Sequence, residues 1–352
     1  MHSSLLPLLL AVVLHSPPAQ AGAAPAKSED VETCLTCHGD KDLSVTLPSG
    51  ETRSLFVDRD TFRGSVHGDK LGCTDCHADM TEMPHPSRPF RDRRAFTVAY
   101  YEQCKRCHFP TYSKTLDSVH NAAVARGDRT APVCVDCHGA HDIQPPNKPK
   151  SRISQTCAKC HQGVSATYTK SVHGVMLLEE KNGDVPVCTD CHRTHNIAGP
   201  RSAGWRLNSP ELCGSCHTNA KLMAKYGLST NVLQTYLADF HGMTASLHRS
   251  RKSESAPFTA LCIDCHGVHD ITRTKEPGSH VMRANLLKTC QRCHPGATAN
   301  FPQAWLSHYE PSWNKAPIVY GVKIFYAILI PFMIGGLAIQ ILMHLWRVVV
   351  NR

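Results

Sequence analysis

Apolar and aromatic residues are scarce in this chain of 352 residues. Hydrophobic residues make up 41% of the sequence and aromatic residues 7%, and two segments near the chain ends hold many of them. We therefore expect less apolar core than a chain of this length usually builds. The formal net charge is +9, yet no basic run with interleaved aromatic residues occurs. This absence argues against a nucleic-acid-binding surface.

None of the 18 cysteines lies outside one recurring pattern, Cys-x-x-Cys-His. The cysteines form the pairs Cys34/Cys37, Cys73/Cys76, Cys104/Cys107, Cys134/Cys137, Cys157/Cys160, Cys188/Cys191, Cys213/Cys216, Cys262/Cys265 and Cys290/Cys293. The histidines that follow them directly are His38, His77, His108, His138, His161, His192, His217, His266 and His294. Two thiols at this spacing can form thioethers with the two vinyl groups of one porphyrin, and the next residue then lies under the iron. The pattern predicts nine covalently bound haem c groups with these histidines as proximal iron ligands.

Two other kinds of site also use Cys-x-x-Cys pairs. A zinc site needs two further Cys or His ligands for each metal ion. A redox dithiol needs no histidine directly after its second cysteine. Because every one of the nine pairs is followed by His, we favour haem. Each oxidised haem with two ionised propionates adds about −1 to the charge, which offsets the basic excess of the chain.

Both chain ends carry an apolar segment. Residues 1–21 have the apolar stretch and small-residue cleavage site of a secretory signal peptide. Ile324–Trp346 has no Asp, Glu, Lys or Arg and, as a helix, is roughly 34 Å long, enough to cross a bilayer. We expect a haem domain over 22–312, a transmembrane helix over 318–347 and a cytoplasmic tail over 348–352. The alternative for the second segment is a helix buried in a soluble core.

The chain between these segments repeats itself. One phrase is an aromatic residue followed by Ser-Val-His, and a second is Cys-His-x-x-His-(Asp/Asn)-Ile. Together they define two-haem units that begin at Cys34, Cys104, Cys157 and Cys213, with a half unit from Cys290. The repeats supply nine further histidines, which we expect to be the distal iron ligands: His67, His85, His120, His141, His173, His195, His241, His269 and His308. His248 and His280 are rivals without a repeat position.

The arrangement of ligands leaves a choice of partners. A histidine three residues beyond a proximal histidine starts on the proximal face, so we expect it to reach a neighbouring haem. We also expect the ninth haem to end at His308, close to the membrane segment. The least certain ligation is in the unit that contains His77 and His85.

The stretch from Cys134 to His141, followed closely by Cys157 to His161, resembles the doubled-CxxCH class of multihaem cytochromes. The resemblance covers residues 34 to about 308. It implies an electron carrier that is periplasmic or extracellular, although some relatives are reductases. It also implies that the nine proximal histidines bind iron, and that the haem domain is exported to the outer side of the inner membrane.

We expect a mainly α fold with long loops, built from repeated two-haem units and cored by haem. A small N-terminal β-hairpin over Leu43–Leu47 and Thr52–Val57 and one C-terminal transmembrane helix complete it. Short helices are expected to end at candidate ligands: Thr111–His120, Ala166–His173 and Val232–His241.

Iron with two imidazole ligands has no open coordination position, which favours electron transfer over catalysis. The sequence therefore predicts no catalytic residues and a single-pass inner-membrane cytochrome with its haem domain in the periplasm. Its expected partners are a polytopic quinol-oxidising or b-type cytochrome subunit in the membrane and other periplasmic cytochromes. The alternative is a terminal reductase of a nitrogen or sulfur oxyanion, which needs a five-coordinate haem. His344, inside the span, is a haem ligand or a residue that hydrogen-bonds to another helix.

Overall fold

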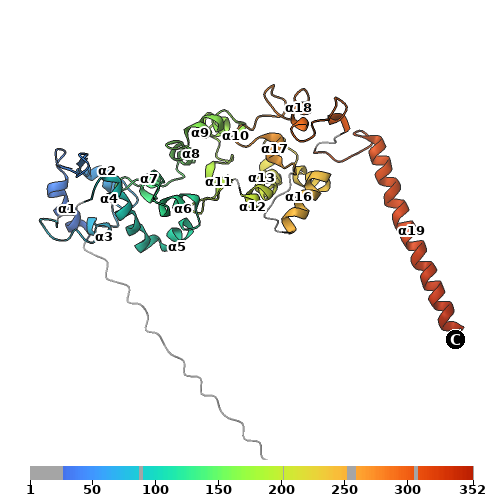
Figure 1. The fold of residues 1–352 in the computed structure, drawn as a ribbon, viewed down its shortest axis with the longest axis horizontal. Helices are drawn as coiled ribbons and strands as arrows, with labels where there is room; N and C mark the ends of the chain where they lie inside the picture. Colours follow the sequence, from blue (N-terminus) through green and yellow to red (C-terminus); the bar gives the residue numbers. More distant parts are fainter. Residues whose placement is uncertain (1–26, 87–89, 201, 252–258, 305–307, 352) are drawn as a thin grey trace, which may run out of the picture. The chain divides into compact units, whose positions relative to one another are not determined.

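A computed structural model describes residues 27–86, 90–200, 202–251, 259–304 and 308–351. The predicted signal peptide lies outside these residues. The chain is mainly helical, with short helices joined by long loops, as predicted (Figure 1). Contacts between Cα atoms divide it into two units, the first made of residues 1–106 and 138–144 and the second of residues 107–137 and 145–352.

The first unit contains the predicted β-hairpin. Its strands β1 and β2 are antiparallel, with Val45 opposite Arg53, and Gly50 has the positive φ of +85° that the connecting turn requires. Both strands are shorter than predicted. The elements that begin in this unit are α1 (Lys27–His38), β1 (Ser44–Thr46), β2 (Thr52–Ser54), α2 (Arg59–Arg63), α3 (Cys73–Cys76), α4 (Arg93–Tyr100), the 3-10 helix η1 (Tyr101–Cys104) and α5 (Lys105–Thr115).

The rest of the chain is a succession of helices, several of which begin at the first cysteine of a haem motif. These elements are α6 (Val119–Ala125), α7 (Cys134–His138), α8 (Ser151–Ala158), α9 (Gln162–Tyr168), α10 (Val172–Leu178), α11 (Cys188–His192), α12 (Ala203–Leu207), α13 (Ser209–His217), α14 (Ala220–Ala224), α15 (Val232–Ala238), α16 (Phe240–Ser250), α17 (Cys262–His266), α18 (Leu286–Gln291), η2 (Pro302–Ala304) and α19 (Pro317–Val350).

The three helices predicted to end at a candidate ligand are wrong in the same way. In each case one helix ends early and a second helix begins just before the histidine, so that His120, His173 and His241 lie at helix N-termini. The residue directly before the second helix accepts a hydrogen bond through its side chain and so caps the N-terminus of that helix. The capping oxygens accept from the backbone N–H of the third residue along: Ser118 from Asn121 at 3.1 Å, Ser171 from Gly174 at 3.1 Å and Asp239 from Gly242 at 3.0 Å.

The apolar core is small, as the composition predicts. One cluster of buried side chains contains Leu177, Val185 and Val187, and a second contains Tyr236 and Leu261 together with an alanine. Each cluster packs beside a haem motif, because Val187 directly precedes Cys188 and Leu261 directly precedes Cys262. The buried apolar residues therefore serve mainly to fix the start of a motif.

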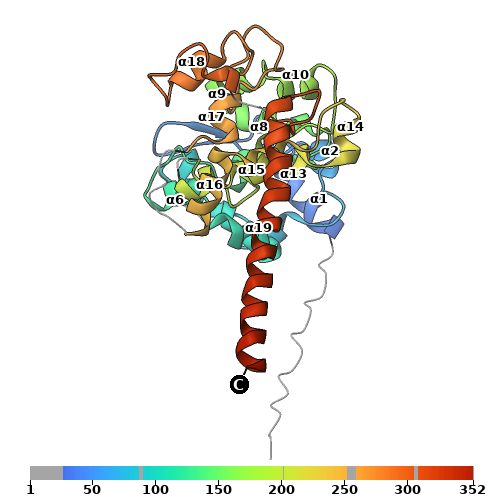
Figure 2. The same ribbon diagram turned by 90° about the vertical axis from the view of Figure 1, so that its right-hand side faces the viewer.

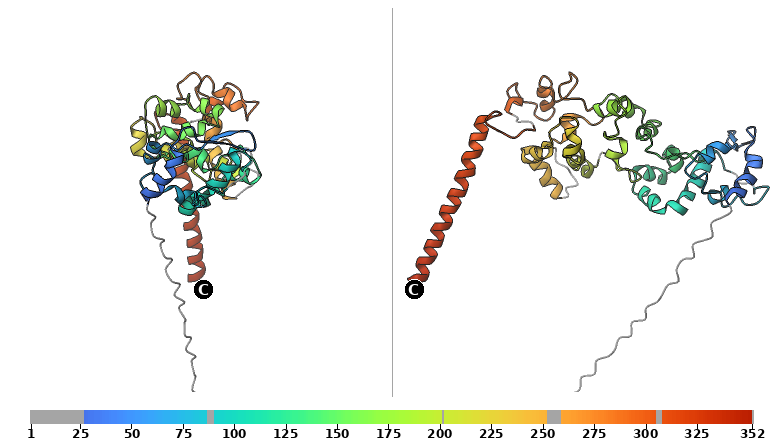
Figure 3. Two further views of the ribbon diagram at one scale, coloured as in Figure 1. Left: turned by 90° about the vertical axis from the view of Figure 1, so that its left-hand side faces the viewer. Right: turned by 180° about the vertical axis from the view of Figure 1, so that it is seen from behind.

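Helix α19 is one uninterrupted helix of 34 residues (Figures 2 and 3). It is slightly longer than the predicted range of 318–347. At 1.5 Å per residue its length is about 51 Å, which exceeds the roughly 30 Å hydrocarbon core of a bilayer. It is long and apolar enough to cross a membrane, in agreement with a single-pass anchor.

Candidate haem-binding sites

Four of the nine motifs have an aspartate before their second cysteine, which the sequence analysis overlooked. In each, a carboxylate oxygen accepts a hydrogen bond from the backbone N–H of the residue that precedes the first cysteine. The signal that identifies these residues in the sequence is the phrase Cys-x-Asp-Cys-His. The bonds run from Gly72 to Asp75 at 2.8 Å, Val133 to Asp136 at 2.7 Å, Val187 to Asp190 at 2.8 Å and Leu261 to Asp264 at 2.8 Å.

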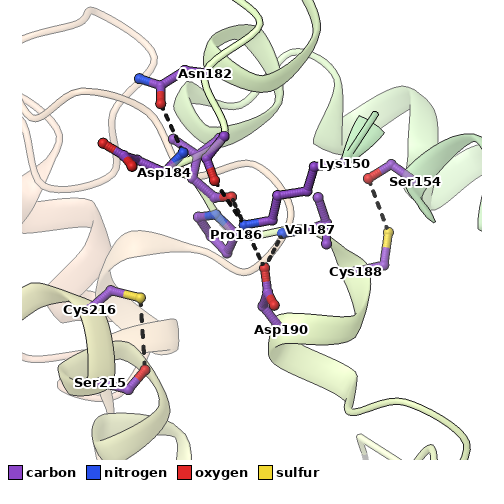
Figure 4. A network of polar contacts seen from close by, with 12 residues as sticks. Lys150, Ser154, Asn182, Asp184, Pro186, Val187, Cys188, Asp190, Ser215 and Cys216 are labelled. Carbon is purple, nitrogen blue, oxygen red and sulfur yellow. Dashed lines mark hydrogen bonds and ion pairs between the residues drawn. The ribbon is translucent and has the colours of Figure 1, made fainter. Parts of the chain in front are cut away.

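The surroundings of Asp190 show how such a motif is held (Figure 4). The Lys150 ammonium lies 3.2 Å from the Asp190 carboxylate and donates a hydrogen bond of 2.8 Å to the carbonyl of Val185. The thiol of Cys188 lies 3.7 Å from the hydroxyl of Ser154 in α8. These contacts tie the motif in α11 to the helix that carries the preceding motif.

In three of the four complete two-haem units the first cysteines of the two motifs lie beside each other. Cys34 and Cys73 are within hydrogen-bonding reach of each other in the first unit of the repeat. Burial, with the neighbouring Cys34, raises the pKa of the Cys73 thiol to about 12. The same contact recurs in later units between Cys157 and Cys188 and between Cys213 and Cys262.

The two cysteines of a motif differ in how far they are covered. The first cysteine is half-buried in all nine motifs, and in the first unit of the repeat Cys34 and Cys73 cover each other in part. The second cysteine lies almost one helical turn further along and away from that contact. It is exposed in six motifs, namely Cys37, Cys76, Cys107, Cys137, Cys160 and Cys293.

Exposure of these six thiols bears on how haem could be attached. A thioether forms only where a vinyl group of the porphyrin can reach the sulfur, so an exposed second cysteine is compatible with attachment. The predicted attachment roles of Cys37, Cys107, Cys160 and Cys293, as of the other cysteines, stay predictions.

The proximal histidines are paired with the additional histidines that the repeats supply. In each described pair the centroids of the two imidazole rings lie between 6.0 and 6.4 Å apart. The pairs are His38–His85 at 6.1 Å, His77–His141 at 6.2 Å, His120–His161 at 6.1 Å, His173–His217 at 6.4 Å, His192–His269 at 6.0 Å, His241–His294 at 6.3 Å and His266–His308 at 6.1 Å.

This spacing suits one metal ion between two rings. With a metal–nitrogen bond of about 2.0 Å and about 1.1 Å from the nitrogen to the ring centre, two coaxial imidazoles on one iron have centroids about 6.2 Å apart. Zinc would need four ligands. Within the part of the chain that the structure describes, no three His, Cys, Asp or Glu side chains cluster tightly enough to hold a metal ion. Paired rings beside two cysteines therefore fit haem c better than zinc.

Hydrogen bonds orient the rings of the first pair. The Nδ1 atom of His38 lies 2.8 Å from the carbonyl oxygen of Leu55, and that of His85 lies 2.8 Å from the carbonyl oxygen of Glu82. A carbonyl only accepts hydrogen bonds, so Nδ1 carries the proton in both rings. This leaves Nε2 of each ring with its lone pair for a metal.

Burial favours the neutral, metal-binding form of two of the paired histidines most strongly, His173 and His266. It lowers the pKa of His173 to about 4, with a smaller contribution from the neighbouring His217. Burial likewise lowers the pKa of His266 to about 4, with a contribution from His308. At neutral pH the proton does not compete for these nitrogens.

The pairing follows a rule with two directions. The Ser-Val-His type of histidine pairs with a proximal histidine further along the chain, as His120 does with His161. The close-following type pairs with a proximal histidine of the preceding unit, as His269 does with His192, except that His85 of the first unit faces His38 of its own unit. In six of the seven pairs the two rings therefore come from neighbouring units of the repeat.

The structure places His308 opposite a proximal histidine of another motif than the ninth. His308 faces His266 of the eighth motif, and the ninth proximal histidine, His294, faces His241 instead. His308 is an exception to the forward direction, because no Cys-x-x-Cys-His motif follows it in the sequence. For His67, His108, His138 and His195 the predicted ligand roles stay predictions.

The second motif, which the sequence marks as least certain, has an aromatic environment. The ring of Tyr100 lies 5.3 Å from that of His77, and its hydroxyl donates a hydrogen bond of 2.8 Å to Asp79. The guanidinium of Arg53 lies 3.3 Å from the ring centre of Phe96, which stacks on Tyr100. These groups surround a proximal histidine that already has a second ring opposite it.

A comparison with known families agrees with this geometry. The family model of cytochrome c3 matches residues 128–218, a stretch that contains four complete Cys-x-x-Cys-His motifs. No curated protein and no solved structure matches the chain. The family match supports a multihaem c-type cytochrome with covalently bound haem c.

Proposed function

We propose that this chain is a nonahaem cytochrome, anchored in the inner membrane, that transfers electrons between a quinol-oxidising membrane partner and periplasmic or outer-membrane redox partners. The observation that carries the proposal is the pairing of motif histidines with second imidazole rings at 6.0 to 6.4 Å. When bound, haem c supplies a reversible Fe(III)/Fe(II) couple. Two imidazoles on its iron leave no position for a substrate, so a row of such sites conducts electrons.

The order of the sites supports conduction along the chain. Within a unit the first cysteines of the two motifs touch, as for Cys157 and Cys188. Between units, Cys191 is an electrostatic neighbour of Cys213 and Cys216. Cys265 is likewise a neighbour of both cysteines of the last motif. The five motifs from Cys157 to Cys293 thus follow each other in space in the order of the sequence.

Helix α19 supplies the proposed link to the membrane partner. Gly336, Gln340, His344 and Arg347 recur at helical spacing and lie on one face of this helix. A polar face inside a membrane needs a protein partner, since lipid tails offer it no hydrogen bonds. We propose that this face binds a polytopic subunit and that His344 hydrogen-bonds to it. His344→Ala should then leave membrane haem spectra unchanged, and loss of a b-type haem signal would make His344 a ligand instead.

Haem stoichiometry and spin state test the central proposal. Protein extracted from membranes is expected to contain nine haems for each chain, all low-spin in low-temperature EPR. Fewer haems, or a large high-spin fraction, would contradict it. A high-spin signal together with turnover of a nitrogen or sulfur oxyanion would support a reductase instead.

A further inference from the structure

The two repeated phrases of the sequence are joined by backbone hydrogen bonds. In each case the N–H of the valine in Ser-Val-His donates to the carbonyl of the isoleucine that ends the second phrase. The bonds run from Val66 to Ile143 at 2.9 Å, from Val119 to Ile197 at 3.0 Å and from Val172 to Ile271 at 2.8 Å. A contact that recurs three times in equivalent positions is a feature of the repeat and not of one loop.

The bond at Val172 connects two neighbouring sites. His173, the next residue, faces His217, whereas His269, two residues before Ile271, faces His192. The motifs of His192 and His217 follow each other in the chain, and their cysteines lie close together. One hydrogen bond therefore joins the two segments that carry the second rings of adjacent sites.

The local structure shows why this bond fixes a ring position. Val172 is the first residue of α10, and its N–H is one of the donors that a helix N-terminus leaves without a partner inside the helix. Ser171 is only 1% exposed. Its hydroxyl donates a hydrogen bond of 2.7 Å to the carbonyl of Tyr168 and accepts one from the backbone N–H of Gly174. The start of α10 is thus held by its own cap on one side and by Ile271 on the other.

We propose that the bond between Val172 and Ile271 is a shared positioning contact, through which the distal ligands of two neighbouring haems are held or lost together. The inference rests on the proposed function, because it takes both histidine pairs to ligate iron. Val172 and Ile271 act through His173 and His269 and touch no iron themselves. Electron transfer between two haems depends on both being held, so the contact secures a step between units.

Val172→Pro removes this hydrogen bond with little other change. Proline is favoured at the first position of a helix, where its ring fits and its missing N–H breaks no bond within the helix. The residue before it must be extended, and Ser171 has φ −72° and ψ 163°. Val172→Ala is the matched control, since it removes the side chain but keeps the N–H.

Carbon monoxide binding to the reduced protein measures how many irons have lost a ligand. Wild type and Val172→Ala are expected to bind almost none, because low-spin iron with two imidazoles has no free position. Val172→Pro is expected to bind about two molecules for each chain, against about one for His173→Ala, which removes a single ligand. The potentials of two haems, and not one, should shift in a redox titration of Val172→Pro.

The outcomes separate this inference from the function on which it rests. If Val172→Pro has a full haem content and behaves as Val172→Ala, or if it loses one ligand only, the shared contact is refuted. If wild type itself binds carbon monoxide stoichiometrically, the proposed function is refuted. Val119→Pro tests the same bond in the preceding repeat, where Ser118 is also extended at φ −88° and ψ 150°. Absence of any effect there would confine the contact to one junction and overturn its role in the repeat.

Discussion

Gly174 follows the candidate ligand His173, and the fold leaves it no room for a side chain. A Cβ atom at this position would lie 1.9 Å from the carbonyl oxygen of Tyr168, 2.7 Å from its carbonyl carbon and 2.8 Å from Cα of Thr169. All three are backbone atoms, so a change of side-chain rotamer cannot relieve the clash and the backbone itself has to move. Gly242, which follows His241, meets the carbonyl oxygen of Tyr236 at the same 1.9 Å.

Gly174→Ala is therefore expected to push the start of α10 away from the end of α9. Carbon and oxygen atoms in contact need about 3.5 Å, so the helix start has to move by roughly 1.5 Å. Overpacking of this kind lowers the free energy of unfolding by about 1–3 kcal/mol. The better helix propensity of alanine offsets at most about 1 kcal/mol of this loss. The imidazole of His173 moves with the backbone and no longer faces His217 correctly.

Thermal unfolding followed at the Soret band, with low-temperature EPR of the oxidised protein, checks this prediction. We expect a lower free energy of unfolding and a new high-spin signal. Asn121→Ala is the control, because Asn121 occupies the same position after His120 and already carries a side chain. Equal stability and equal spectra for the two variants would show that the close approach at Gly174 does not constrain the ligand.

Two further substitutions follow from the repeats. Arg193 has φ +67° and ψ 174°, a region open almost only to glycine, and Gly267 occupies the matching position at φ +84°. Arg193→Gly should therefore stabilise the protein by about 1–3 kcal/mol, seen as a higher thermal midpoint, and an unchanged midpoint would refute the assigned strain. Asp190→Ala leaves the N–H of buried Val187 without its acceptor and should cost about 1–3 kcal/mol. Chemical denaturation measures that loss, and a cost equal to that of Asp142→Ala, which lies outside the Cys-x-Asp-Cys-His phrase, would argue against the capping role.

The sequence predicts the composition of the sites better than their assembly. Cys-x-x-Cys-His is a local pattern, so the attachment residues can be read directly, and the hairpin around Gly50 follows from its turn. The helix boundaries before His120, His173 and His241 could also be predicted from the sequence, since Ser118, Ser171 and Asp239 are typical N-cap residues. The pairing of His308 with His266 could not be predicted, because it depends on how the loops between repeats fold back.

The pairing of histidines from different units has a consequence for the order in which the protein matures. On the proposed export the chain would emerge with its N-terminus first, so Cys188 and Cys191 would become accessible before the next repeat has left the membrane. The ring that faces His192 belongs to His269, which arrives only with that repeat. On the proposed ligation, the site of Cys188, Cys191 and His192 would gain its second imidazole only when the following unit folds back and brings His269 to it.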